Sequence, residues 1–317
     1  MDAVIRMQPY QHLFGPVPSR RLGLSLGIDL CPPKTCTANC VFCQLGTTRA
    51  TTVDRKEYVP TAEVLTELDD WLGGGKHADY LTLAGSGEPT LHTRFGDVLR
   101  HIRAHSRHRT ALLSNGTLFH LPEIRADAVL ADVVKLSLSA WDEASFQQIN
   151  RPHSTLRFSN LVQGYDAFRA QFAGELWLEV FLLRGINDSI RGLDAIAELA
   201  RRFRPNRIHL NTAVRPPAEP SVHALTQNEL TALARMFDPV AEVIAEFKTK
   251  DGGKGSTAAP SAVTILSLLA RHPATADEIA AANGAAPATV TVHLRALLAD
   301  GRIVAEVHGN HTYFRAI

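Results

Sequence analysis

Short runs of alternating apolar and polar residues recur along most of the chain, and a stretch with helical spacing follows each run. The clearest run lies between Leu22 and Leu30, where every second residue is leucine or isoleucine. A period of two predicts a β-strand, and a period of three to four predicts a helix. Further strands are predicted at 80–83, 111–113, 133–138, 176–183 and 208–211. The helices predicted with them cover 62–72, 95–105, 122–130, 142–150, 160–172, 193–203 and 227–237.

This order of elements contains six strand-then-helix units. Parallel neighbouring strands need crossover connections, and a helix is the usual one, so the order indicates an α/β fold with a parallel sheet. Six units are fewer than the eight that close a full barrel. We therefore predict a partial (β/α)6 TIM-like barrel over residues 1–247. In such folds the chemistry gathers in loops at the carboxyl ends of the strands.

The last quarter of the chain has a different pattern. Residues 248–260 are polar and rich in glycine, which predicts a flexible linker. Helical spacing returns at 262–270, 276–282 and 288–298, and a hairpin is expected from 303–307 and 312–314. Three helices and a terminal hairpin follow the order of a winged helix-turn-helix domain, which we place at 261–317.

The charge of this predicted domain bears on its partner. Residues 256–317 contain four arginines and four acidic residues, a net charge of zero: Arg271, Arg295, Arg302 and Arg315 against Asp277, Glu278, Asp300 and Glu306. Binding to nucleic acid depends on neutralising phosphates with basic side chains. We therefore expect protein or peptide docking, or dimerisation, rather than nucleic-acid binding.

The whole chain is close to neutral as well, with 33 basic and 32 acidic residues. Hydrophobic residues make up 45%, which is typical of a globular protein and not of a disordered one. No apolar run approaches the ~18 residues of a membrane span. The opening residues lack the basic-then-apolar pattern of a signal peptide. We expect a cytoplasmic protein without membrane contact.

All four cysteines lie between positions 31 and 43, and Cys36, Cys40 and Cys43 have the spacing Cys-x3-Cys-x2-Cys. Thiolates are soft ligands that suit iron–sulfur clusters and zinc, whereas disulfides are rare in a reducing compartment. Three ligands on a four-iron cluster leave one iron open. A four-thiolate zinc site, or a fully ligated electron-transfer cluster, would also use Cys31. We leave Cys31 outside the ligand set.

The cysteine spacing, Phe42 before the last cysteine, and the run from Gly85 to Pro89 after a predicted strand resemble the radical S-adenosylmethionine (SAM) superfamily. The resemblance implies a [4Fe-4S] cluster on Cys36, Cys40 and Cys43. It also implies reductive cleavage of SAM to a 5′-deoxyadenosyl radical that abstracts hydrogen from a substrate. A reductant such as flavodoxin or ferredoxin would supply the electron.

The resemblance also implies a SAM pocket, in which the Glu88 carboxylate would suit the SAM ammonium group. The residues assigned to this pocket are Phe42, Gly85, Ser86, Gly87, Glu88, Pro89, Ser114, Asn115, Ser137, Ser139 and Asn211. Glu179 and Asn187 are weaker candidates for the same cavity. The sequence singles out no catalytic residue.

A narrower resemblance rests on residues 14–23 and on the runs 149–152 and 184–188. These resemble a bacterial and archaeal branch related to the 4-demethylwyosine synthases, here with a C-terminal winged helix. One alternative is therefore an enzyme that modifies a tRNA base or other nucleic acid. The lack of cysteines for a second cluster counts against wyosine formation itself. Another alternative is an iron–sulfur sensor whose winged helix binds DNA.

Overall fold

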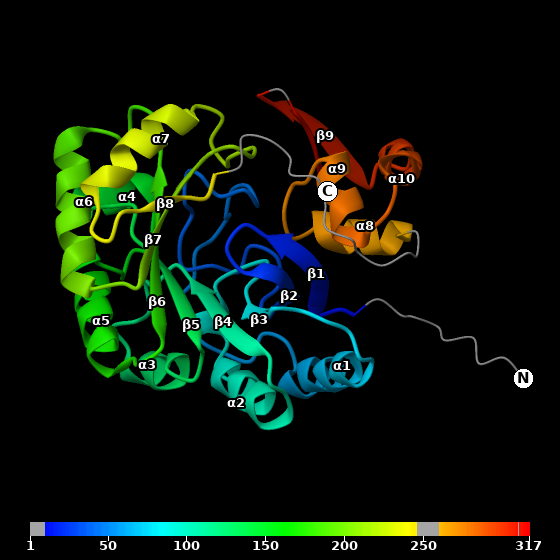
Figure 1. Ribbon diagram of the computed structural model, residues 1–317, viewed down its shortest axis with the longest axis horizontal. Coiled ribbons are helices and arrows are strands. Elements are labelled where there is room, and N and C mark those ends of the chain that lie inside the picture. The colour runs from blue at the N-terminus through cyan, green and yellow to red at the C-terminus, as the bar shows by residue number, and fades with distance from the viewer. Residues whose placement is uncertain (1–9, 246–259, 310) are drawn as a thin grey trace, which may run out of the picture.

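The protein is described from a computed structural model, which places residues 10–245, 260–309 and 311–317 (Figure 1). One sheet forms the centre of the larger part, with its strands in sequence order: β1 (Leu13–Ser19), β2 (Gly23–Ile28), β3 (Tyr80–Leu83), β4 (Arg109–Ser114), β5 (Val133–Ser137), β6 (Glu175–Leu182), β7 (Arg207–Thr212) and β8 (Glu242–Val243). All neighbours from β2 to β8 are parallel, and β1 pairs with β2 in antiparallel fashion. No pairing between described strands joins β8 back to β1, so the barrel is open.

Helices connect the parallel strands and cover the outer face of the sheet (Figure 1). They are α1 (Thr61–Gly73), α2 (Phe95–His105), α3 (Pro122–Ala128), α4 (Glu143–Ile149), α5 (Phe158–Gln171), α6 (Ile190–Phe203) and α7 (Gln227–Leu233), with short 3-10 turns at Pro89–Leu91 and Ala234–Met236. The predicted α/β fold with a partial parallel barrel is confirmed.

The alternating residues of each strand divide the barrel into two environments. On β6, Leu176, Leu178 and Val180 pack outward into the main core against the helices. Trp177 belongs instead to a separate small cluster inside the barrel, with Leu22, Ala111 and Val133. This inner cluster forms an apolar floor near the amino ends of the strands. On β5 and β6 the next inward residues toward the carboxyl ends are polar, Lys135 and Glu179, so the inner face of these two strands changes from apolar to polar along the barrel.

Two strands of the sheet were not predicted. β1 contains Pro16 and Pro18, which interrupt its alternation and lack an amide hydrogen, so it occupies the edge of the sheet. β8 has only two residues, which is too short for a pattern to show. The strand predicted from Leu22 to Leu30 was too long, because β2 begins at Gly23 and ends at Ile28.

The C-terminal part contains α8 (Ala262–Leu269), α9 (Ala276–Asn283) and α10 (Pro287–Ala299), then an antiparallel hairpin of β9 (Ile303–His308) and β10 (His311–Ala316). It has its own core, and helices α8 and α9 contact β1 of the barrel. The predicted linker at 248–260 lies, except for Pro260, outside the described residues. Within the part of the chain that the structure describes, no helix has the length and apolarity needed to cross a membrane.

Candidate active site

The cysteine motif lies in the loop that follows β2, at the carboxyl end of the barrel. Backbone hydrogen bonds hold this loop against the segment after α4: Asn39 N–H donates to the carbonyl of Arg151, and Val41 N–H donates to that of Ile149. Cys36, Cys40 and Cys43 are half-buried free thiols. The loop is therefore held through its backbone at residues 39 and 41.

Each of these three sulfurs has a nitrogen donor from a different residue. Lys34 Nζ lies 3.5 Å from the sulfur of Cys43, and Asn150 Nδ2 lies 3.4 Å from that of Cys40. Asn115 Nδ2 lies 3.5 Å from the sulfur of Cys36. Hydrogen bonds of this kind stabilise negative charge on a metal-bound sulfur and tune the metal. Lys34 and Asn150 were not predicted as site residues, although both flank the motifs that carried the resemblance.

The surroundings of the cysteine motif disfavour free thiolates. Burial raises the pKa of Cys36 to about 12 and raises that of Cys40 above its ordinary range. Glu88 and then Cys43 raise the pKa of Cys36 further, and Cys36 and Cys43 raise that of Cys40. No three His, Cys, Asp or Glu side chains among the described residues are arranged around one metal ion. An iron–sulfur cluster spreads its thiolates over different irons, and metal binding deprotonates them.

Cys31 is separate from this arrangement. Its side chain is buried, and its thiol donates to the backbone carbonyl of Glu88 at 3.3 Å. Burial raises the pKa of the Cys31 thiol above its ordinary range. The thiol is thus engaged with the neighbouring loop.

The glycine-rich run from Gly85 to Pro89 follows β3 and lies directly against the cysteine loop. Lys34 N–H donates to the carbonyl of Ser86 at 2.8 Å, and Glu88 N–H donates to that of Thr35 at 2.9 Å. A Cβ added to Gly87 would lie 2.0 Å from the oxygen of Thr35, which no side chain allows. Glycine at this position lets the two loops meet through their backbones.

The Glu88 carboxylate contacts the residues that follow β3 and β4. It is only 2% exposed and accepts hydrogen bonds from the amide and hydroxyl of Thr90, from Ser114 Oγ at 2.7 Å and from Asn115 N at 2.8 Å. Three of these bonds end on Oε1 of Glu88 and one ends on Oε2. Glu88 therefore joins the loops after β3 and β4, and it holds Asn115 beside Cys36.

The remaining predicted pocket residues lie at the carboxyl ends of β5 to β7, except for Phe42, which belongs to the cysteine loop. Phe42 stacks on Phe181, with ring centroids 4.3 Å apart. Ser139 Oγ accepts from the amide of Phe181, and the carbonyl of Ser137 accepts from Tyr165. Asn187 is fully buried and donates to the carbonyls of Ser139 and Phe181, so it organises this part of the backbone.

Deeper inside the barrel than these carboxyl ends, the inner face carries a group of buried charged side chains. Glu179 lies 2.9 Å from Lys135 Nζ, 3.0 Å from Arg21 Nη1 and 3.0 Å from Asn211 Nδ2. Burial alone would raise the pKa of Glu179, but the charges of Arg21 and Lys135 outweigh burial and lower it well below its usual range. The carboxylate is therefore ionised, and two cations face one anion.

His209 is the register partner of Glu179 in the β6–β7 pairing, and it is 1% exposed. Within the described residues, its Nδ1 and the Nη1 of Arg21 are buried without a hydrogen bond; the Arg21 contact with Glu179 meets the distance of an ion pair only. Burial, and then the charge of Arg21, lower the pKa of His209 to about 4. The imidazole is neutral at physiological pH. Sequence reasoning missed His209 and Lys135.

The lowered pKa of His209 predicts a loss of stability in mild acid. Because the folded pKa is about 4 and the unfolded value is 6.5, the contribution is complete above pH 6.5 and is lost as the pH falls toward 4. Over that range the loss amounts to about 3 kcal/mol, at about 1.4 kcal/mol per pH unit. Urea unfolding across this range should show a shallower pH slope for His209→Gln than for the wild type.

The slope should decrease without vanishing, because burial also lowers the pKa of His92 and His272. An unchanged slope in His209→Gln would contradict the neutral, buried imidazole. His77→Gln is the control, since this histidine is exposed.

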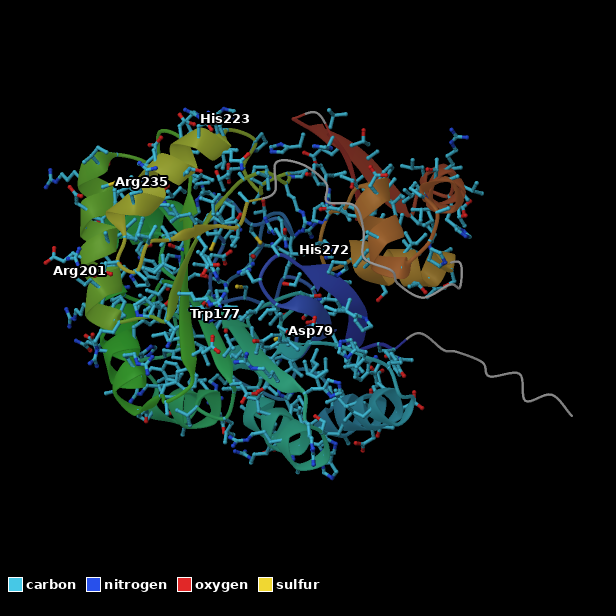
Figure 2. The ribbon with its side chains drawn as sticks, viewed as in Figure 1. Asp79, Trp177, Arg201, His223, Arg235 and His272 are labelled. Carbon is cyan, nitrogen blue, oxygen red and sulfur yellow. The ribbon has the colours of Figure 1, made fainter. Side chains whose placement is uncertain are left out.

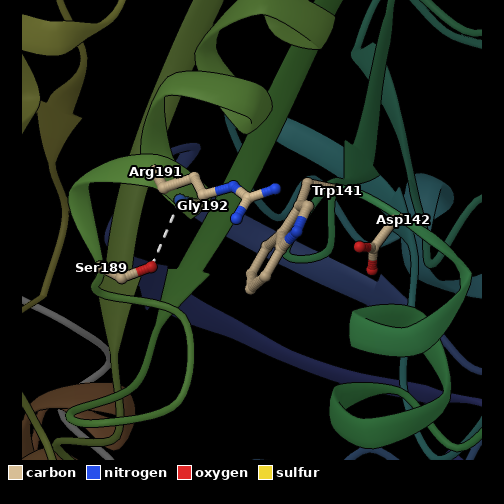
Figure 3. A pocket seen from close by; sticks show the side chains of 5 residues that line it. All are labelled: Trp141, Asp142, Ser189, Arg191 and Gly192. Carbon is tan, nitrogen blue, oxygen red and sulfur yellow. Dashed lines mark hydrogen bonds between the residues drawn. The ribbon is translucent and has the colours of Figure 1, made fainter.

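A hollow of about 280 Å³ lies near the start of α6 (Figure 3). Its lining residues are Trp141, Asp142, Ser189, Arg191 and Gly192. None of these residues belongs to the predicted pocket, and the hollow plays no part in the chemistry below.

Comparison with known proteins gives a consistent result. Residues 30–206 match the radical SAM superfamily, and residues 259–303 match the bacterial regulatory proteins of the arsR family. A UPF0026 protein of Methanocaldococcus jannaschii is 33% identical over 76% of this chain and 74% of its own length. A protein named GTPase Obg of Brachyspira hyodysenteriae is 35% identical over 94% of this chain, but the chain spans only 44% of that protein's length.

Solved structures agree in fold. A radical SAM methyltransferase from Sphaerobacter thermophilus superposes with a TM-score of 0.52 at 16% identity, covering 71% of this chain and 67% of its own. SuiB of Streptococcus suis gives 0.50 at 13% identity, over 69% of this chain and 48% of its own. At these identities the likeness concerns the fold alone.

Proposed function

Since the chain belongs to the radical SAM superfamily of enzymes, we propose that it holds a [4Fe-4S] cluster on Cys36, Cys40 and Cys43 and cleaves SAM beside it. The observation that carries the proposal is the pairing of each of these sulfurs with its own nitrogen donor, next to a glycine-rich loop at the carboxyl ends of the strands. A bound cluster and SAM would supply a 5′-deoxyadenosyl radical that abstracts hydrogen from a substrate.

The residues of this chain would position and shield that chemistry. Asn115, Asn150 and Lys34 stabilise negative charge on the sulfurs. The backbone of Gly85 to Glu88 offers polar groups at close range to the cysteine loop. Phe42 and Phe181 form an apolar wall beside it, which keeps water from the reacting atoms. Ser114, Ser137, Ser139 and Asn211 complete the pocket.

The charged group inside the barrel favours a substrate with negative or hydrogen-bond-accepting groups. Arg21 and Lys135 bring two positive charges against the single negative charge of Glu179, and the buried imidazole of His209 is neutral. Arg21 and His209 each keep a polar atom that a bound acceptor could satisfy.

The test is anaerobic reconstitution with iron and sulfide, reduction with dithionite in the presence of SAM, and detection of 5′-deoxyadenosine by mass spectrometry. We expect deoxyadenosine, and we expect more of it with a cell-extract fraction that an anion exchanger retains. A protein that assembles the four-iron cluster yet forms no deoxyadenosine, even with extract, would contradict the proposal. Stimulation by a nucleic-acid fraction would favour the base-modifying alternative.

The arsR-type match favours a second candidate, an iron–sulfur sensor that binds DNA. In a winged helix-turn-helix domain the third helix is the recognition helix, which contacts DNA bases. Here the third helix is α10, and it lies on the side of its domain away from the barrel (Figure 1). Its exposed side chains include Val292, Leu298 and Arg295, which offer little charge to phosphates. A sensor should shift specific DNA in a cluster-dependent manner and form no deoxyadenosine.

A further inference from the structure

The C-terminal domain is joined to the barrel through the edge strand and the loop after β7. Val17 of β1 packs into the core of the C-terminal domain. His308 Nε2 lies 2.9 Å from the carbonyl of Ala213, and Tyr313 donates to the carbonyl of Val214 at 3.1 Å. Figure 2 shows His272 at this junction, next to β1. The domain thus sits beside the end of the barrel that carries the cysteines.

Between the described residues of the two parts, two ion pairs cross this interface. Arg215 Nη2 lies 2.6 Å from Glu278 Oε1, and Arg271 Nε lies 3.2 Å from Asp29 Oδ2. The second pair is the more deeply buried, with side chains 10% and 7% exposed against 19% and 23% for the first. The pairs also differ in the further contacts that their barrel residues make.

In the second pair, the barrel residue Asp29 contacts the glycine-rich loop. The Asp29 carboxylate accepts from the amide of Ser86 at 3.0 and 3.1 Å, from its hydroxyl at 2.5 Å, and from the amide of Cys31 at 3.4 Å. A Cβ on Gly85 would lie only 2.3 Å from the carboxyl carbon of Asp29. Asp29 is therefore the group that fixes Gly85 and Ser86 in place.

Arg271 is itself held from both sides of the interface. Its guanidinium donates to the backbone carbonyl of Gln11 at 2.7 Å and to Ser267 Oγ at 2.7 Å, and it lies 5.0 Å above the ring of Phe14. A buried carboxylate needs a compensating charge, and removing that charge leaves a costly unpaired group. In the described part of the protein, Arg271 is the cation paired with Asp29.

We propose that Arg271 is a positioning residue for SAM binding, so that the winged-helix domain forms part of the SAM site. The chain of contacts runs from Arg271 through Asp29 to Ser86 in the loop that would hold SAM. This inference rests on the proposed function. In this role the C-terminal domain supports the loop that would hold SAM, and it needs no partner molecule to do so.

The experiment compares Arg271→Gln with Glu278→Gln in cluster-reconstituted protein, by measuring the SAM dissociation constant in equilibrium dialysis. Each substitution removes one charge from the C-terminal side of one interdomain ion pair. Glutamine at 278 keeps an acceptor for its capping contact with Thr275. We expect Arg271→Gln to raise the dissociation constant about tenfold, as for other groups that orient a ligand-holding residue, and Glu278→Gln to change it by less than about twofold.

The outcomes separate the two claims. Equal effects of the two substitutions, or none in Arg271→Gln, would overturn the role of Arg271 while SAM binding by the wild type stands. A wild-type protein that binds no SAM would overturn the proposed function and this inference with it. Should Arg271→Gln not fold, Arg271→Lys, which keeps the charge, is compared with Glu278→Asp; the lysine variant should bind SAM more weakly than the aspartate variant, and equal binding would overturn the role of Arg271.

Discussion

Replacing Cys36, Cys40 or Cys43 with alanine is expected to abolish both the assembled cluster and the formation of 5′-deoxyadenosine. Each of these sulfurs has its own nitrogen donor. No other thiol can replace a lost one, because the fourth, Cys31, is buried and bonded to the carbonyl of Glu88. Iron and sulfide content, the visible absorbance of the reconstituted protein and deoxyadenosine yield measure the result.

Cys31→Ala is the matched control, since it removes a thiol from the same loop. It should retain the cluster and the product, with a loss of stability of about 1 kcal/mol from the missing hydrogen bond. Loss of the cluster in Cys31→Ala would support the alternatives in which all four cysteines are ligands, namely a zinc site or a fully ligated cluster. Metal analysis of the wild type would then decide between zinc and iron.

Replacing Gly87 with alanine is expected to lower deoxyadenosine formation by about 100-fold, as displacements of about 1 Å in a reacting geometry do. The new Cβ would lie 2.0 Å from the backbone oxygen of Thr35 and 3.1 Å from Cys31 Cβ. Backbone cannot rotate away as a flexible side chain can, so the glycine-rich loop must separate from the cysteine loop. The hydrogen bond from Glu88 N to Thr35 would be lost with it.

Gly73→Ala provides the control for Gly87→Ala. Gly73 ends α1, and nothing lies within 4 Å of a Cβ added there. That substitution should leave activity unchanged and should not destabilise the protein. Cluster content should stay near the wild-type level in Gly87→Ala, because the three cysteines are untouched; full activity in that variant would contradict the close packing of the two loops.

The sequence predicted the elements whose periodicity is undisturbed, and it failed where local pattern and tertiary structure differ. Strands β3 to β7 alternate or are uniformly apolar, so their positions followed from the pattern. β1 could not be predicted in this way, because its prolines and glycine break the alternation, and only pairing with β2 and the C-terminal domain keeps it extended.

The same distinction holds for the candidate site. Spacing along the chain and the family resemblance singled out the cysteines and the glycine-rich run as candidates. It could not show that Glu88 turns inward to Ser114 and Asn115, because that depends on the approach of β4 to β3. Asp29 gave no signal either, since a single aspartate at the end of a strand is common, and its partner Arg271 lies in another domain.

The pairing of Asp29 with Arg271 also has a consequence for the order in which the protein is completed on the ribosome. The two residues are 242 positions apart, and Arg271 is 260 positions from Gln11, whose backbone carbonyl it also contacts. Domains generally fold as they emerge, with the N-terminal one first. In the barrel each strand pairs with its neighbour in sequence, so the sheet can grow strand by strand during synthesis. The loop of Ser86 gains its last anchor only when the final domain has been made, so a barrel released early would carry every cysteine of the motif but an unfinished cofactor loop.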